Sequence, residues 1–272
     1  MTQDGGMPET SVGRTPEGEH LADQERLLEE LTEQLATKET EFATLGVEFA
    51  RFRATYLIRF APLYAELDGL EAEIARLLVE RVGGDGPAAT AARARADEAE
   101  ARAKESASAA EGAEDGSEPQ SEPTPNLKAL YRRVAKAVHP DLASDDAERA
   151  RRTQVMATAS EAYAAGDEQA LRRILDGEAA RPEAIIGDDV ASRLVRVIRK
   201  QAQITMRLAE LEQLTRSLSA DPLFVLFEQG RAAWEAGDDP LAEDERDLRT
   251  RIASARAGLA ALRVTTRQGS QG

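Results

Sequence analysis

The sequence contains no cysteine, so disulfide bonds, thiol catalysis and cysteine-ligated metal sites are excluded. Aromatic residues are also scarce: they make up 4% of the 272 residues, whereas charged residues make up 31%. A chain with so few large apolar side chains and so many charges favours elongated helices over a large globular core. Because the strong helix formers Ala, Glu, Arg and Leu dominate, we expect an all-α fold.

The sequence also lacks a long apolar run. No stretch approaches the roughly 20 apolar residues of a membrane span, and residues 1–19 are polar, without the apolar segment of a secretory signal. We therefore expect a cytoplasmic protein that does not enter a membrane. The net charge of -15 argues against a broad nucleic-acid surface, because phosphates are bound mainly by Lys and Arg.

Residues 20–82 have the apolar spacing of a coiled coil, after a head at 1–19 that we expect to be disordered. One extra four-residue step, from Tyr56 to Phe60, is a stutter. Pro62 beside it removes a helix hydrogen bond, so a kink near Pro62 is expected, in either one bent helix or a two-helix hairpin. The seam alternates in steps of three and four, with Lys38 in its one missing place, through Leu28, Leu31, Leu35, Phe42, Leu45, Phe49, Phe52 and Tyr56.

Residues 83–125 are expected to be an acidic flexible linker, rich in Ala and Glu. The run 83–87, with three glycines and a proline, ends the first arm. The stretch that follows has no apolar stripe, so a helix there would be exposed and marginal. From 111 to 125 the chain mixes Glu, Ser, Gly, Gln and Pro, a composition typical of a flexible segment.

Residues 188–265 are predicted to form a second coiled-coil region, a helical hairpin. Asp221-Pro222 and Asp239-Pro240 each place an N-cap before a proline, so two further helices are expected to start there. We expect the last helix to pack back on the first, and 266–272 to be a disordered tail. The apolar seam of the first helix comprises Val190, Leu194, Val197, Ile204, Leu208, Leu211 and Leu218. The aromatic residues expected in the core of the hairpin are Phe224, Phe227 and Trp234.

Residues 126–176 form a separate helical module with a small local excess of positive charge, which suggests an acidic protein partner. A helix capped by Thr124-Pro125 is predicted to place Leu127, Leu130, Val134 and Val138 on one face and Lys128, Arg132 and Lys136 on the other. His139 ends this helix, Pro140 prevents its continuation and Asp141 opens the loop.

A second helix of the module is predicted to begin at the cap Ser144 and to end at Gly166, and Asp167 is expected to cap a short third helix. The result is an antiparallel hairpin with a short following helix. The apolar face of its second helix comprises Val155, Met156, Ala159, Ala162 and Tyr163.

The module resembles the J domain of DnaJ-type co-chaperones. The run from Leu130 to Asp141, LYRRVAKAVHPD, is similar to the second J-domain helix, with its tyrosine, adjacent basic pair and terminal His-Pro-Asp. Met156, Ala159 and the run SEAY from Ser160 to Tyr163 look like the third helix and its Glu-Ala-Tyr. The tripeptide alone is a weak signal, but both flanking helices match in order and spacing. The expected fold is therefore all-α, with elongated coiled-coil helices flanking a small J-domain-like hairpin.

The resemblance implies a partner. The tripeptide His139, Pro140 and Asp141 is expected to contact the ATPase domain and interdomain linker of a DnaK-type heat-shock chaperone and to stimulate its ATP hydrolysis. Because that chemistry belongs to the partner, this chain is expected to be no enzyme, with no catalytic residue, cofactor or metal. Four further side chains are expected to dock on an acidic surface of the ATPase: Tyr131, Arg132, Arg133 and Lys136.

Two features depart from the family pattern. The usual first helix, with an aromatic pair and Leu-Gly, is not visible upstream of the module, so a coiled-coil segment would have to replace it in packing. Leu142 follows Asp141, where many family members carry a basic residue. The alternative hypothesis is therefore a structural coiled-coil scaffold with a vestigial J-like module.

Enzyme functions find no supporting motif. The other histidine, His20, is over a hundred residues from His139, so a metal-binding pair is not expected. The sequence has neither the phosphate-binding loop G-x-x-x-x-G-K-[ST] nor a nucleophile elbow. The predicted coiled coils leave two further kinds of partner open: client proteins, and a second copy of the chain.

Overall fold

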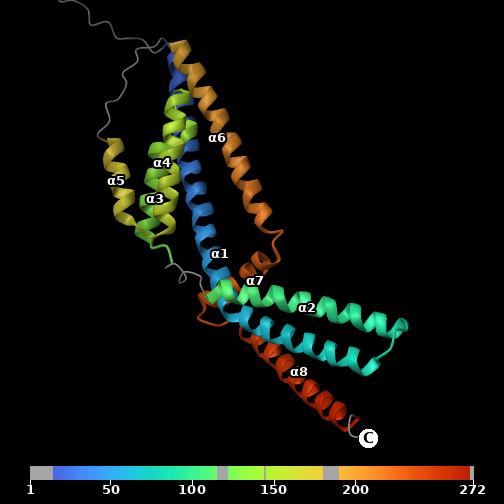
Figure 1. Ribbon diagram of the computed structural model, residues 1–272. Helices are drawn as coiled ribbons and strands as arrows, with labels where there is room; N and C mark the ends of the chain where they lie inside the picture. Colours follow the sequence, from blue (N-terminus) through green and yellow to red (C-terminus); the bar gives the residue numbers. More distant parts are fainter. Residues whose placement is uncertain (1–14, 115–121, 144, 180–189, 270–272) are drawn as a thin grey trace, which may run out of the picture. The chain divides into compact units, whose positions relative to one another are not determined.

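The structure is a computed structural model, and it describes residues 15–114, 122–143, 145–179 and 190–269. All regular secondary structure in these ranges is helical, which confirms the all-α prediction (Figure 1). None of the described helices is both long enough and apolar enough to cross a membrane. The elements are α1 (Pro16–Val82), α2 (Pro87–Glu114), α3 (Pro125–Val138), the short 3-10 helix η1 (Pro140–Leu142), α4 (Asp146–Ala164), α5 (Glu168–Ala179), α6 (Val190–Leu218), α7 (Pro222–Glu235) and α8 (Ala242–Gly269).

The chain divides into two compact units, and α1 contributes to both. Unit 1 combines residues 1–46 with 122–217, and so holds the first part of α1, the helices α3 to α5 and α6. Unit 2 combines residues 47–121 with 218–272, and so holds the rest of α1 with α2, α7 and α8.

The helix α1 is unbroken from Pro16 to Val82, with Pro62 inside it. Of the two arrangements that the stutter left open, the structure therefore has the single helix. Phe60 and Ala61, beside the proline, are buried, and this packing maintains the helix despite the lost hydrogen bond. The helix begins within the expected disordered head, because Pro16 is compatible with a first helical turn; the rest of that prediction, residues 1–14, lies outside the described residues.

The apolar core of unit 1 joins the first part of α1 to α6. Its centre is Leu35 of α1 with Ile204 and Leu211 of α6, all nearly inaccessible to solvent. The two seams predicted from the sequence therefore pack against each other within one chain, while the supercoil itself stays a prediction. The residues packed around this centre are Leu28, Leu31, Phe42, Leu142 and Leu208.

The central module folds as a hairpin with a third helix, because α3, α4 and α5 pack against one another in every pair (Figure 1). Thr124 accepts a hydrogen bond from the Leu127 amide and caps α3, as predicted. The cap of α4 is Asp145, which accepts from the Glu148 amide, and not the predicted Ser144, which lies outside the described residues. Gly166, at φ +72°, ends α4 in the left-handed conformation that glycine tolerates.

The stretch predicted to be a flexible linker instead contains the 28-residue helix α2. It packs on the second part of α1 within unit 2, where Ser106 donates a hydrogen bond to Asp68. The alanines at 89, 99 and 113 of this helix are buried. Alanine was too weakly apolar to register as a stripe, yet its small side chain allows two helices to approach closely, and packing then stabilises a marginal helix. Residues 115–121 lie outside the described residues.

The region 188–265, predicted to form a helical hairpin, is divided between the two units, so the packing of its last helix on its first stays a prediction. Unit 2 contains α7 and α8, whereas α6 belongs to unit 1. The arginines Arg256 and Arg263 of α8 pair with Glu66 and Glu73 of α1, because heptad-spaced charges beside the α1 seam provide a complementary edge. The helix α8 extends to Gly269, into the tail predicted to be disordered.

Of the two predicted N-terminal caps of this region, Asp221 caps its helix, whereas Asp239 lies three residues before the start of its helix. Asp221 accepts from the Leu223 amide with Pro222 in the first turn of α7, as predicted. Asp239 accepts from the Leu241 amide, but α8 itself begins two residues after Pro240, at Ala242.

Aromatic rings form the core of unit 2. Phe224 and Phe227 of α7 lie 5.1 and 5.8 Å from the ring of Phe49 on α1, between centroids. Trp234 lies 5.0 Å from Phe52 in an edge-to-face arrangement. These aromatic residues are core residues, as predicted, and within unit 2 they pack on α1.

Candidate functional site

The His-Pro-Asp tripeptide forms the turn between α3 and α4. Helix α3 ends at Val138, and Pro140, which has no amide hydrogen to continue it, opens the short 3-10 helix η1. The Leu142 amide donates to the His139 carbonyl at 3.1 Å, and the Asp141 amide donates to Nδ1 of His139 at 3.2 Å. The turn is therefore closed by its own backbone and by the imidazole.

The His139 side chain faces the first part of α1 and is buried, with 3% of the residue exposed. Its Nε2 lies 3.0 Å from Oε1 of Glu39, a residue that is itself 6% exposed. Because Nδ1 accepts the Asp141 amide, we assign the ring proton to Nε2, which donates to the Glu39 carboxylate.

Glu39 joins the turn to α6. Nε of Arg207 donates to the same oxygen, Oε1, at 2.8 Å. Burial raises the pKa of the Glu39 carboxyl, but the hydrogen bonds from His139 and Arg207 and the charge of Arg207 outweigh burial and hold that pKa below its usual value. The Glu39 carboxylate is thus kept ionised by two donors from two other segments of unit 1.

A cavity of about 640 Å³ lies beside the turn in unit 1. Four of the seven predicted partner-binding residues line it: Tyr131, His139, Pro140 and Asp141. Gln203 of α6 also lines it. We assign the orientation of its side-chain amide from the neighbouring groups, so that its nitrogen donates to the Asp141 carbonyl oxygen at 3.0 Å. The structure therefore brings the tripeptide and Tyr131 together at one cavity, which residues of α6 also line.

Tyr131 belongs to the core of the hairpin. It is 2% exposed, its ring centroid lies 4.6 Å from that of Tyr163, and its hydroxyl lies 3.0 Å from Ser160 Oγ. Burial raises the pKa of its phenol. Its partner Tyr163 lies 2.5 Å, hydroxyl to hydroxyl, from Thr44 of α1. The predicted surface role of Tyr131 is therefore not supported by its placement, because an aromatic ring at this position is needed to fill the hairpin.

Two of the three predicted basic residues form ion pairs with α1. Arg132 and Lys136 both pair with Glu33 of α1, with Lys136 Nζ 3.0 Å from Oε2. The hydrogen bond from Lys136, together with the charges of both cations, outweighs desolvation and lowers the pKa of Glu33. Arg133 is exposed.

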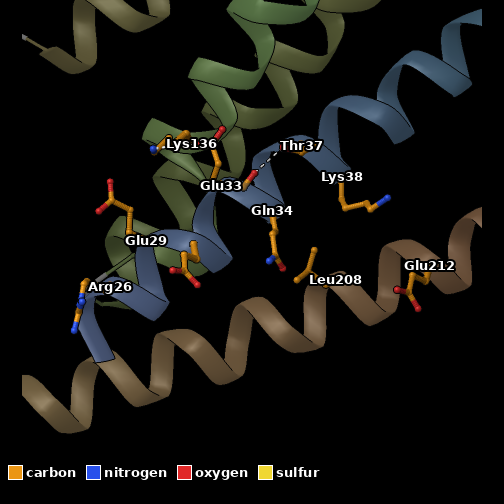
Figure 2. A pocket seen from close by; sticks show the side chains of 10 residues that line it. Arg26, Glu29, Glu33, Gln34, Thr37, Lys38, Lys136, Leu208 and Glu212 are labelled. Atoms are coloured by element: carbon orange, nitrogen blue, oxygen red, sulfur yellow. Dashed lines mark hydrogen bonds and ion pairs between the residues drawn. The ribbon is translucent and has the colours of Figure 1, made fainter. Parts of the chain in front are cut away.

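A second cavity of unit 1, of about 800 Å³, lies where α1, α3 and α6 meet. Figure 2 shows Glu33 of α1 and Lys136 of α3 on one side of it, and Leu208 and Glu212 of α6 on the other. Its wall mixes carboxylates (Glu29, Glu30, Glu33 and Glu212) with the cations Arg26, Lys38 and Lys136.

Glu39 and Arg207 were not among the predicted site residues, although both hold His139 in place. The seam placed Lys38 in the gap between Leu35 and Phe42, but Lys38 is exposed and pairs with Glu41 at 2.7 Å. Glu39 satisfies the same gap with steps of four and three, and it is the residue that is buried. A charged residue in a core position of a heptad seam was the available signal, because burial of a charge requires a specific partner.

The described residues contain no group of three or more His, Asp or Glu side chains that could hold a metal ion. Comparison of the chain with protein-family models, with curated proteins and with solved structures found no match. The site consequently stands on its own geometry: a closed turn, a buried chain of hydrogen bonds from Arg207 through Glu39 to His139, and an adjoining cavity.

Proposed function

We propose that this protein is a J-domain-like co-chaperone that binds a DnaK-type ATPase and stimulates its ATP hydrolysis. The observation that carries the proposal is the position of Pro140 and Asp141 at a tight turn between the packed helices α3 and α4. This is the arrangement that the resemblance implies for the tripeptide. The partner supplies the nucleotide and the chemistry, so the chain acts by contact.

The absence of the usual first helix is compatible with this function because α1 supports the hairpin. Thr44 contacts Tyr163, Glu39 contacts His139, and Leu142 packs on the core between α1 and α6. An apolar residue after Asp141, one of the two departures from the family pattern, therefore has a structural reason in this protein. The long helices would select clients or anchor the complex, in the cytoplasm.

The test is the steady-state ATPase rate of a DnaK-type chaperone with the wild-type chain and with Asp141→Asn. The side chain of Asp141 is 26% exposed, so its replacement spares the core. We expect the stimulated rate to fall at least tenfold. Asp146→Asn is the matched control, since it makes the same chemical change at a side chain that is 99% exposed, at the first residue of α4.

His139→Gln is a second variant, with its folding checked by circular dichroism because His139 is buried. Equal stimulation by the wild type, Asp141→Asn and His139→Gln would refute a role for the tripeptide. Absence of stimulation by every form, including forms in which His139 is accessible, would refute the co-chaperone function.

A coiled-coil scaffold is the second candidate, and one observation favours it: the chain itself already occupies His139, Arg132 and Lys136 through Glu39 and Glu33. A motif that only stabilises its own fold has no need of an ATPase. The scaffold predicts no ATPase effect together with a stable oligomer, measured by light scattering. A monomeric mass would contradict an intermolecular coiled coil.

A further inference from the structure

Three of the residues expected to face the ATPase, His139, Arg132 and Lys136, are held by α1. Glu39 of α1 accepts from His139, and Glu33 of α1 pairs with Arg132 and Lys136. The two carboxylates lie six positions apart on one helix. Both contact the same hairpin: Glu33 contacts α3, the helix that ends at the tripeptide, and Glu39 contacts the tripeptide itself.

A second element secures this arrangement from α6. Arg207 donates to Glu39, Gln203 donates to the carbonyl of Asp141, and the side chain of Leu142 packs against the core that contains Ile204. The turn therefore contacts two helices. Its polar groups bind Glu39 of α1 and Gln203 of α6, and Leu142 packs on the apolar core between these helices.

We infer that the first part of α1 and α6 form a mask that keeps the His139-Pro140-Asp141 turn from the ATPase until the turn is released. The inference rests on the proposed function and adds its regulation. The carboxylate of Glu33 occupies the cations that are expected to meet an acidic surface of the partner, so mask and partner compete for the same charges.

The mask is built to open more readily than a core. Its contacts with Arg132 and Lys136 are partly exposed: the side chains of Glu33, Arg132 and Lys136 are 42, 45 and 44% accessible. Such ion pairs contribute little to folding, and a competing charge can replace them. The buried part depends on one carboxylate with two donors, so the loss of either donor leaves Glu39 under-paired in a desolvated site.

The experiment measures the accessibility of His139 directly. The chain has two histidines, and His20 is exposed, so it provides an internal reference for modification by diethyl pyrocarbonate followed by mass spectrometry. In the wild type we expect His139 to react at least tenfold more slowly than His20. Equal rates for the two histidines in the wild type would overturn the mask.

Two variants release the turn from different sides. Glu33→Lys places a third positive charge beside Arg132 and Lys136 at a partly exposed position, where the fold tolerates the change. Its matched control is Glu29→Lys, which makes the same change one helical turn earlier beside the same cavity (Figure 2). Arg207→Met removes the α6 donor and keeps an apolar stem, and Arg216→Met, at an exposed position of α6, is its control.

The released variants are expected to raise the His139 modification rate and the stimulated ATPase rate of a DnaK-type chaperone, each at least threefold, while the controls match the wild type. Circular dichroism verifies folding; if Arg207→Met loses helix content, Glu33→Lys alone decides. An accessible His139 with unchanged, wild-type stimulation would overturn the mask and leave the proposed function standing. An accessible His139 with no stimulation by any form would overturn both.

Discussion

The helix α1 serves two units with different chemistry. In unit 1 it contacts the tripeptide hairpin through Glu33, Glu39 and Thr44, by ion pairs and hydrogen bonds. In unit 2 it contacts α7 through the rings of Phe49 and Phe52. Apolar contacts stabilise in proportion to buried area, whereas polar contacts depend on each partner remaining in place and ionised. One helix can thus combine a permanent apolar core in unit 2 with polar contacts in unit 1 that depend on pH and salt.

The largest expected effect is in unit 2. Phe52→Ala removes a ring that contacts Phe227 and Trp234, at a position 4% exposed. We expect a loss of about 3 to 5 kcal/mol, from lost burial and the remaining cavity. Hydrogen exchange of α7 peptides measures it, and Phe52→Leu, which keeps most of the volume, should lose clearly less. Unchanged exchange in α7 would show that the aromatic cluster does not stabilise unit 2.

The next effect is in unit 1. Glu39→Ala leaves His139 and Arg207 without their common acceptor. We expect destabilisation of about 2 kcal/mol, below the cost for a fully buried pair because Arg207 is partly exposed. Faster hydrogen exchange in α3 and η1, with α7 unchanged, is the expected result. An equal increase in α7 would contradict the assignment of the effect to unit 1.

A pH titration sharpens the comparison further. The folded pKa of Glu39 lies below its ordinary value of 4.5, so its stabilising contribution is present above pH 4.5 and is lost as the pH falls through the folded pKa. Amide exchange in α3, corrected for intrinsic rates, should increase on acidification more in the wild type than in Glu39→Gln, which does not titrate. Parallel profiles for the two proteins would show that Glu39 does not cause the loss.

The smallest effect is that of salt. The pairs of Glu33 with Arg132 and Lys136 are exposed enough for ions to screen, since the Debye length is about 3 Å at 1 M salt. We expect a modest increase in the His139 modification rate in sodium chloride, absent in Glu33→Gln. The aromatic core of unit 2 should not respond. If the modification rate of His139 did not depend on salt, the ion pairs of Glu33 would play no part in shielding His139.

Local signals in the sequence were read correctly where one residue acts on its own backbone. Thr124, Gly166 and Asp221 terminate or cap helices as expected, because each needs only its neighbours along the chain. The prediction of α2 as linker was wrong because alanines at a helix contact carry little apolar signal. The cap of α4 was displaced by one residue, since Asp145 and Ser144 have equal propensity for that role.

The sequence by itself determined that this protein is all-α, that two apolar seams exist, and that His139-Pro140-Asp141 ends a helix and begins a turn. Helix propensity, heptad spacing and the missing amide of proline are local properties. Only the tertiary structure decided that the seam of α1 meets that of α6, and that Glu39 and Arg207 enclose His139. Those partners are 100 and 168 positions apart in the chain, and no local preference encodes which of many Glu and Arg residues will meet.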